Sequence, residues 1–101
     1  MFHGKNFLVK ELTVNSKSSI SLQKHHHRSE HWMIAQGNPK ITINNKKFFK
    51  KKNSSVFIPV GSIHRIENIY NKPVKIIEIQ TGRLLRESDI VRYKDIYGRI
   101  N

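Results

Sequence analysis

Along most of the chain, short runs rich in β-forming residues follow one another, and several of them alternate apolar and polar positions with the two-residue period of a half-buried β-strand. Short polar segments rich in Asn, Ser, Gly and Pro separate the alternating runs, as expected for turns. Many short strands at regular spacing are typical of an all-β sandwich or small barrel. The pattern predicts strands over residues 7–14, 19–23, 31–37, 40–44, 56–61 and 73–82.

The last part of the chain departs from this alternation. In the stretch ESDIVRYKDIYGRI (87–100), Ser88 or Asp89 is suited to cap the start of a helix and Gly98 to end it. The stretch therefore predicts a short C-terminal helical segment, or a pair of turns, packed against the barrel.

Length and composition limit the class of protein. A chain of 101 residues with 37% hydrophobic content predicts a single domain over residues 1–101 with one modest core. The chain has no cysteine, so any metal must take nitrogen and oxygen ligands, and a cytoplasmic location is expected. No signal peptide is evident, and no apolar run approaches the roughly 20 residues of a membrane span.

The chain carries a formal net charge of +12, which favours an anionic partner such as a phosphorylated metabolite. The most basic run, KKFFKKK (46–52), falls in a predicted hairpin. Lysines on such an edge strand discourage aggregation, so we interpret the run as a solvated edge. Nucleic-acid and membrane binding are not expected.

Four of the six histidines crowd into the segment QKHHHRSEHW (23–32). Alternate residues of a strand share a face, so Gln23 should point with His25, and Glu30 with Trp32. A second polar segment, PVGSIHRIEN (59–68), contains His64 just after a tight turn. Nitrogen and oxygen donors from these separate strands could form a mononuclear metal site at the mouth of the barrel.

The second segment resembles a signature of the cupin superfamily, PxGxxHxxxN, through Pro59, Gly61, His64 and Asn68. The first cupin signature is an HxH pair, three or four residues, Glu, six residues and Gly. Glu30 and Gly37 have the required spacing.

The spacer length decides which residues take the place of the HxH pair. A spacer of four residues before Glu30 selects Gln23 and His25, whereas a spacer of three selects Lys24 and His26. An ammonium group has no lone pair to donate, so the first alignment is preferred. Starting the pair at His25 leaves too few residues before Glu30.

The segments QKHHHRSEHW, IPVGSIHRIEN and DIVRYKDIYGR together resemble the phosphomannose isomerase domain, over roughly residues 7–100. In type II enzymes this domain is the C-terminal part of a bifunctional mannose-6-phosphate isomerase/mannose-1-phosphate guanylyltransferase. No Gly-rich nucleotide loop accompanies it here, which suggests a stand-alone isomerase domain or a fragment of a longer chain. The resemblance implies an all-β cupin barrel (double-stranded β-helix, jelly-roll) with four metal ligands: Gln23, His25, Glu30 and His64.

The implied reaction interconverts mannose 6-phosphate and fructose 6-phosphate through an enediol(ate) and supplies GDP-mannose for polysaccharide synthesis. The implied cofactor is a divalent metal, zinc first, with manganese, cobalt or iron as alternatives. A base must move a proton between C1 and C2, and we expect it to be His31, His26 or His27, because imidazole titrates near neutral pH. Glu67 is a weaker candidate, because the pleat places it opposite His64.

Guanidinium groups suit phosphate and enediolate oxygens, because they donate two hydrogen bonds in one plane. We expect Arg28 near the reacting atoms, and Arg92 and Arg99 at the anionic end of the substrate. Two alternatives remain open: a cupin isomerase or epimerase acting on another sugar phosphate, and a metal- and sugar-binding module without turnover. A homodimer through sheet edges is a further expectation.

Overall fold

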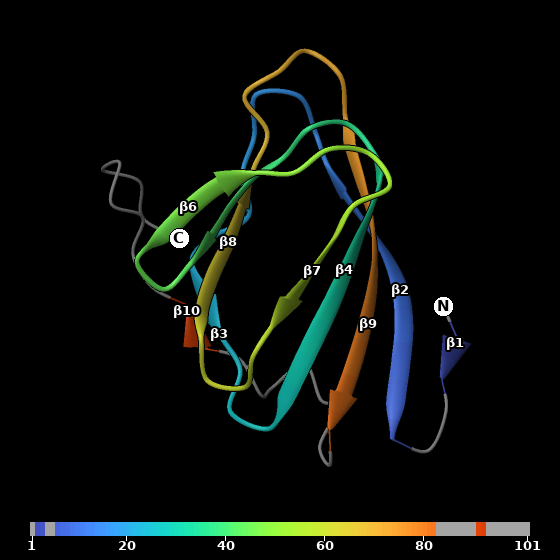
Figure 1. Ribbon diagram of the computed structural model, residues 1–101, viewed down its shortest axis with the longest axis vertical. Coiled ribbons are helices and arrows are strands. Elements are labelled where there is room, and N and C mark those ends of the chain that lie inside the picture. Colours follow the sequence, from blue (N-terminus) through green and yellow to red (C-terminus); the bar gives the residue numbers. More distant parts are fainter. Residues whose placement is uncertain (1, 4–5, 83–90, 93–101) are drawn as a thin grey trace.

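The computed structural model describes residues 2–3, 6–82 and 91–92, which form ten antiparallel strands in two facing sheets (Figure 1). Within these residues there is no helix, and so none long and apolar enough to cross a membrane. The first sheet contains, in spatial order, β1 (Phe2–His3), β2 (Phe7–Val14), β9 (Val74–Gly82), β4 (Arg28–Gln36) and β7 (Ser55–Ile58). The second contains β10 (Val91–Arg92), β3 (Gln23–Lys24), β8 (Ile63–Glu67), β5 (Lys40–Ile43) and β6 (Lys46–Phe49).

The all-β prediction is confirmed, and the two longest runs give the most accurate strand boundaries. The run over 7–14 is strand β2, and the run over 73–82 is strand β9 to within one residue. The basic run begins in the hairpin of β5 and β6, as expected. The run over 56–61 leaves the sheet after Ile58, where Pro59 begins the turn toward β8.

The strand predicted over 19–23 is largely wrong. Only Gln23 belongs to a strand, and Ser19 forms an isolated bridge with Glu67 of β8. The Ile20 N–H donates to the Ile66 carbonyl at 2.9 Å, so the segment does lie along β8. The ladder is interrupted between this bridge and the pair of Gln23 with His64, and an interrupted ladder does not form a continuous strand.

The predicted C-terminal helix is also wrong where it can be compared with the structure. Val91 and Arg92 form strand β10, whose residues pair with Lys24 and Gln23 of β3. The backbone groups at the free edge of β3 pair with these two residues in an antiparallel ladder. The remainder of 87–100 lies outside the described residues.

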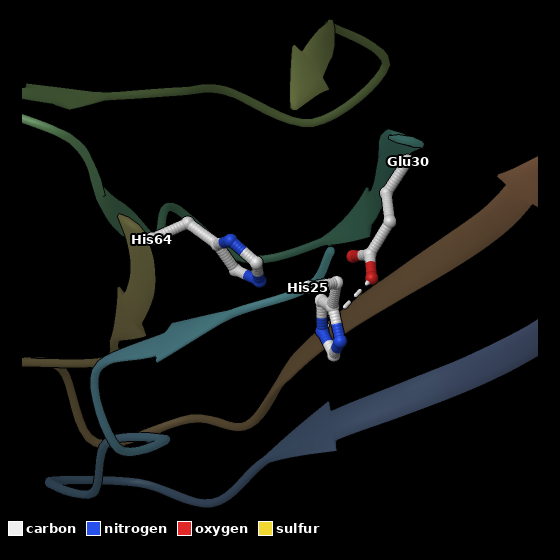
Figure 2. Close-up of side chains that lie close together, drawn as sticks. All are labelled: His25, Glu30 and His64. Atoms are coloured by element: carbon white, nitrogen blue, oxygen red, sulfur yellow. Dashed lines mark ion pairs between the residues drawn. The ribbon is translucent and has the colours of Figure 1, made fainter. Parts of the chain in front are cut away.

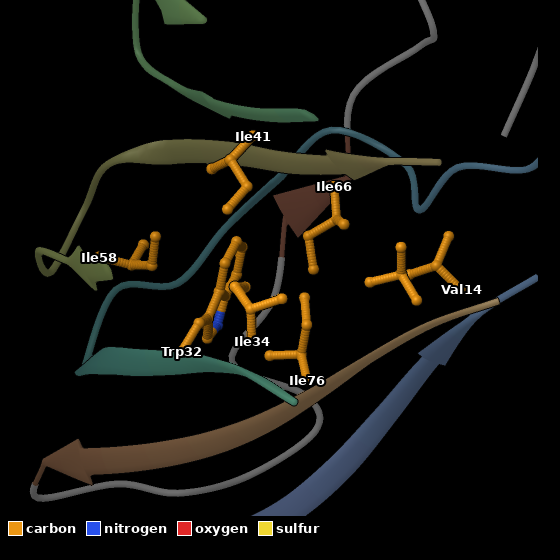
Figure 3. Close-up of a cluster of buried hydrophobic side chains, with 8 residues drawn as sticks. Val14, Trp32, Ile34, Ile41, Ile58, Ile66 and Ile76 are labelled. Carbon is orange, nitrogen blue, oxygen red and sulfur yellow. The ribbon is translucent and has the colours of Figure 1, made fainter. Parts of the chain in front are cut away.

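The core lies between the sheets and draws on both of them (Figure 3). The central strands β4 and β9 alternate buried and more exposed residues, so every second side chain points inward. Trp32 is 1% exposed. Full burial of an apolar side chain such as Ile34 contributes about 1.5–3 kcal/mol. The core residues are Val14, Trp32, Ile34, Ile41, Ile58, Ile66, Val74 and Ile76.

The same inward alternation becomes polar toward one end of β4 and β9. Arg28 and Glu30 on β4 are buried, as are Glu78 and Gln80 on the neighbouring β9. The two strands are antiparallel, with Glu30 opposite Gln80 and Trp32 opposite Glu78. The polar residues therefore gather at one end of the space between the sheets, and this end contains the candidate site.

Candidate metal centre

Three buried side chains converge at the polar end, and Figure 2 shows them pointing toward one another. His25 follows β3, Glu30 lies on β4 and His64 lies on β8, so both sheets contribute. One ligand atom from each residue lies within 4.8 Å of the others. The exposed fractions are 3%, 1% and 5%. Two imidazoles and a carboxylate form a donor set that suits a divalent transition metal.

Gln23 reaches the same place through the sheet. It lies directly opposite His64 in the β3–β8 ladder and lines the cavity beside the three converging residues. Arg92 is the neighbour of Gln23 on the other side, in strand β10. The structure therefore brings three of the predicted ligands together, and the fourth, Gln23, lines the cavity beside them with β10 as its neighbour.

The turn between β7 and β8 fixes the position of His25 and His64. The Gly61 N–H donates to the His25 carbonyl at 2.9 Å, and Gly61 has a φ of +79°, which favours glycine. The Ser62 hydroxyl closes the turn by donating to the Pro59 carbonyl at 2.7 Å. This geometry explains the Pro and Gly of the segment PVGSIH.

His64 is held as a neutral imidazole. Its Nδ1 lies 3.2 Å from the Ser62 carbonyl, which can only accept, so Nδ1 carries the proton and Nε2 retains its lone pair. Burial, followed by the neighbouring His25, lowers the pKa of His64 from 6.5 to about 4. A neutral imidazole with one free lone pair is the form that binds a metal.

Arg28 contacts two of the converging side chains. Its Nε donates to Glu30 Oε2 at 3.0 Å, and its Nη2 lies 3.0 Å from His25 Nε2. A guanidinium has no acceptor, so His25 Nε2 must present a lone pair to it. His25 Nε2 lies 3.3 Å from Glu30 Oε2, and the cationic guanidinium of Arg28 contacts both of these atoms. A divalent ion would take the lone pairs that Arg28 now uses, so the donor set fits a metal.

Trp32 links the converging residues to a second buried carboxylate. Its indole Nε1–H is shared between Glu30 Oε1, at 2.8 Å, and Glu78 Oε2, at 3.2 Å. The other oxygen of Glu78 accepts a hydrogen bond from Gln80 Nε2 at 2.6 Å. The indole also packs edge-on against His64, with ring centroids 5.5 Å apart. A core residue thus orients the candidate carboxylate ligand.

Glu78 is a buried acid with a perturbed ionisation. Burial is the largest cause, and the hydrogen bonding and negative charge of Glu30 add to it. Together they raise the pKa of the Glu78 carboxyl from 4.5 to about 7, against the opposing effects of Gln80 and Lys10. Two carboxylates that share one indole donor cannot both ionise readily, and a divalent cation at Glu30 would relieve part of this cost.

A cavity of about 180 Å³ opens beside the converging residues. Its cationic lining consists of Lys10, Arg28 and Arg65, and Glu78 is its acidic member. Sequence reasoning missed Lys10, Arg65 and Glu78, although the inward alternation of IIEIQ (76–80) placed Glu78 on the buried face. The full lining is Lys10, Leu12, Ile20, Gln23, His25, Arg28, Trp32, His64, Arg65, Ile66 and Glu78.

The histidines expected as the base do not line this cavity. His31 is exposed on the outer face of β4, where its ring packs 4.9 Å from that of Phe57. The pleat that turns Glu30 inward turns His31 outward, away from the cavity. His26 and His27 are exposed in the β3–β4 connection.

Glu67, the weaker candidate, pairs with Lys40 in the second sheet and does not line the cavity either. For Arg92 only the strand position is described, and Arg99 lies outside the described residues. Asn68 is buried and donates to the Lys72 carbonyl at 2.7 Å, so it has a structural role in the turn before β9.

Residues 1–95 match the family described as mannose-6-phosphate isomerase C-terminal. The alginate biosynthesis protein AlgA of Pseudomonas putida is 45% identical over 96 residues, which are 95% of this chain and 20% of that protein. A mannose-1-phosphate guanylyltransferase of Klebsiella pneumoniae is 46% identical over 93 residues, which are 92% of this chain and 20% of that protein. The chain thus spans about one-fifth of the length of these curated relatives.

Solved structures show the same fold at lower sequence identity. The cupin domain of Schizosaccharomyces pombe Cnp3 superposes with a TM-score of 0.78 at 20% identity, covering 81% of this chain and 61% of that one. A predicted oxalate decarboxylase from Thermotoga maritima gives a TM-score of 0.72 at 26% identity, covering 77% and 68%. The two facing sheets are therefore those of a cupin, a double-stranded β-helix.

Proposed function

Because the chain belongs to the mannose-6-phosphate isomerase C-terminal family, we propose that it interconverts mannose 6-phosphate and fructose 6-phosphate with a bound divalent metal. The convergence of His25, Glu30 and His64 beside a cationic cavity carries this proposal. Zinc remains the first expectation, with manganese, cobalt or iron as alternatives.

The proposed ligands are Gln23, His25, Glu30 and His64. A divalent ion held by them would supply a Lewis acid that polarises the substrate oxygens. Trp32 fixes one oxygen of Glu30, and the Ser62 carbonyl fixes the His64 tautomer, so the donor atoms are oriented before binding.

Arg28 would move from the ligand atoms to the substrate once a metal takes its place. Its guanidinium then offers planar donation to an oxyanion that forms at C1 or C2. Arg92 and Arg99 remain proposed contacts for the anionic substrate. We assign the proton transfer to none of the three histidines, because none of them lines the cavity.

The names of the relatives support a role of the proposed reaction in polysaccharide synthesis. They carry the names alginate biosynthesis protein, xanthan biosynthesis protein and mannose-1-phosphate guanylyltransferase. Such a route needs a mannose phosphate as its precursor. The conversion of fructose 6-phosphate to mannose 6-phosphate would provide it. We propose that this chain supplies mannose 6-phosphate for the synthesis of GDP-mannose. The cytoplasmic location, the single domain and the homodimer stay predictions.

A coupled isomerase assay on metal-stripped and metal-reloaded protein tests the proposal. We expect chelation to abolish the isomerisation of mannose 6-phosphate and added metal to restore it. Glu30→Gln should lose both metal and activity, whereas Glu11→Gln, the same change on the exposed face of β2, should keep both. Activity that survives both metal removal and Glu30→Gln would sink the proposal. Metal and sugar binding without exchange of the C2 proton would favour a binding module instead.

A further inference from the structure

The outward face of the first sheet is apolar as well as the inward one. Its four longer strands, β2, β9, β4 and β7, lie side by side (Figure 1). Residues that are directly opposite each other in a ladder share a face of the sheet. One outward row across these strands consists of Val9, Ile79, His31 and Phe57.

The large apolar side chains of this face are open to solvent. Phe57 is 48% exposed and Ile79 is 39% exposed. In the next outward row Met33, which is 44% exposed, lies opposite the half-buried Ile77. Together these residues form the outer apolar face: Val9, His31, Met33, Phe57, Ile77 and Ile79.

Such a face is unusual for a sheet that has a core on its other side. An antiparallel sheet with one side packed on the core commonly has polar residues on the outward side. Single exposed apolar residues are normal, whereas a contiguous cluster of them marks an interaction site. Because the outer apolar face runs without a break across four strands, we interpret it as a docking surface.

The outer apolar face has almost no charge, although the chain has a formal net charge of +12. At the outward positions of the described strands β2, β4, β7 and β9, the charged residues are Glu11 and Lys75, which have opposite signs. The outward side of the second sheet, in contrast, includes Lys40 and Lys47. Like charges across an interface oppose association, so two copies of this basic chain can meet best through the face that lacks them.

The edges of the two sheets are less suitable for a second copy. The edge strands of the first sheet are β1, with two residues, and β7, with four. Those of the second sheet are β10, with two residues, and β6, which begins with Lys46 and Lys47. Short strands and lysines both discourage pairing through a sheet edge.

The size of the face limits the strength of an association through it. Four strands about 4.8 Å apart, with outward side chains about 6.7 Å apart along each strand, extend about 20 Å in each direction. The resulting flat area of about 400 Å² is half of the roughly 800 Å² per partner of a standard specific interface. An association through this face alone is therefore weak and reversible, with a dissociation constant in the micromolar range.

We propose that the outer apolar face binds the same face of a second copy of this chain, in a weak homodimer that does not use the sheet edges. A two-fold axis would bring each residue of the face into the interface twice. The pleat places the face on the opposite side of the first sheet from Glu30 and Glu78, so the proposal is independent of the isomerase function.

Analytical ultracentrifugation of the chain at concentrations from about 1 μM to about 1 mM covers this range of dissociation constants. The average mass of the parent should rise from that of a monomer toward that of a dimer. Ile79→Lys places two like charges in a two-fold interface and should weaken the association at least tenfold. Ile69→Lys is the matched control, because Ile69 is 46% exposed in the β8–β9 connection, and it should associate like the parent.

Salt separates an apolar contact from a charged one. Added salt screens the repulsion between two strongly basic copies, so it should strengthen the association of the parent. An association that salt weakens would overturn the proposal. Met33→Lys is a second variant in case Ile79→Lys disturbs the fold, and circular dichroism checks both variants.

Two further results would overturn the proposal. Folded Ile79→Lys and Met33→Lys variants that associate like the parent would exclude this face as the interface. A parent that stays monomeric over the whole concentration range would exclude a second copy as its partner. The face would then be left to another occupant, such as the remaining four-fifths of the longer relatives.

Discussion

The two ends of β4 and β9 use one backbone pattern for opposite purposes. At one end, inward positions carry Ile34 and Ile76, both fully buried among apolar side chains. At the other end, the same alternation carries Glu30 and Glu78, which are buried as deeply but are hydrogen-bonded. Trp32 lies between the two ends and belongs to both, since its ring packs in the core and its N–H binds the carboxylates.

This difference shows what the alternation does and does not determine. Period-two alternation decides which residues point inward, whereas residue type decides whether the inward end is a packed core or a polar site. Burying two acids next to each other is unfavourable without compensation. Burial at the apolar end therefore stabilises the fold. This stabilisation offsets the cost of burying the polar donors that could bind a cation.

Ile34→Ala should break the apolar end and have the largest effect. The truncation of a fully buried aliphatic side chain typically lowers the free energy of unfolding by about 2–5 kcal/mol, because a cavity remains. Ile79→Ala, on the outward face of β9 and 39% exposed, is the matched control and should cost far less. Chemical denaturation of the metal-free chain measures both. Equal losses in the two variants would contradict the inward and outward assignment.

The polar end can be broken by pH instead of by truncation. His64 has a pKa of about 4 when folded and 6.5 when unfolded, so it lowers stability as pH falls from 6.5 to 4. Glu78 has a folded pKa of about 7 against 4.5, so it lowers stability as pH rises from 4.5 to 7. The two slopes oppose each other between pH 4.5 and 6.5.

Glu78→Gln should expose the slope of His64. We expect the free energy of unfolding of the metal-free parent to change little between pH 4.5 and 6.5 relative to that of the variant. The variant should gain up to about 3 kcal/mol as pH rises over the range set by His64. Denaturant titrations at several pH values give the difference, in which other titrating groups cancel. Parallel pH profiles would show that Glu78 is not a buried, protonated acid.

Much of this fold was predictable because its signals are local. Strand β2 is readable directly from FLVKELTV (7–14), and the spacing of Glu30 to Gly37 pointed to the cupin signature. The outward position of His31 was predictable too, because it follows the inward Glu30 in the same strand. The histidine was favoured for its chemistry, although its geometry had already placed it on the other face.

The parts of the site that the sequence did not predict depend on pairing between distant segments. Lys10 meets Glu78 only because β2 pairs with β9 in one register, across 68 positions of sequence. Strand β10 exists because β3 has an edge to pair with, which no local propensity of Val91 and Arg92 reveals. Local sequence signals set faces and turns, but register between strands decides which buried polar groups meet.

Trp32→Phe should separate the two roles of the residue between the ends. Phenylalanine keeps most of the apolar packing but leaves Glu30 and Glu78 without their shared donor, at a cost of about 1–3 kcal/mol. Metal affinity should fall as well, because Glu30 loses its orientation. Calorimetric metal titration and denaturation measure the two losses. Unchanged metal affinity would show that the indole N–H does not orient the ligand.

His31→Ala compares the two faces of one strand and should have the smallest effect on stability and activity. His31 and Glu30 are neighbours in the chain but lie on opposite faces of β4, and a substitution at an exposed site usually changes stability by less than about 0.5 kcal/mol. Isomerase activity and metal content should match the parent, with only the contact to Phe57 lost. A large fall in kcat with intact metal would return His31 to the list of proton carriers, because the loss of a surface contact cannot produce it.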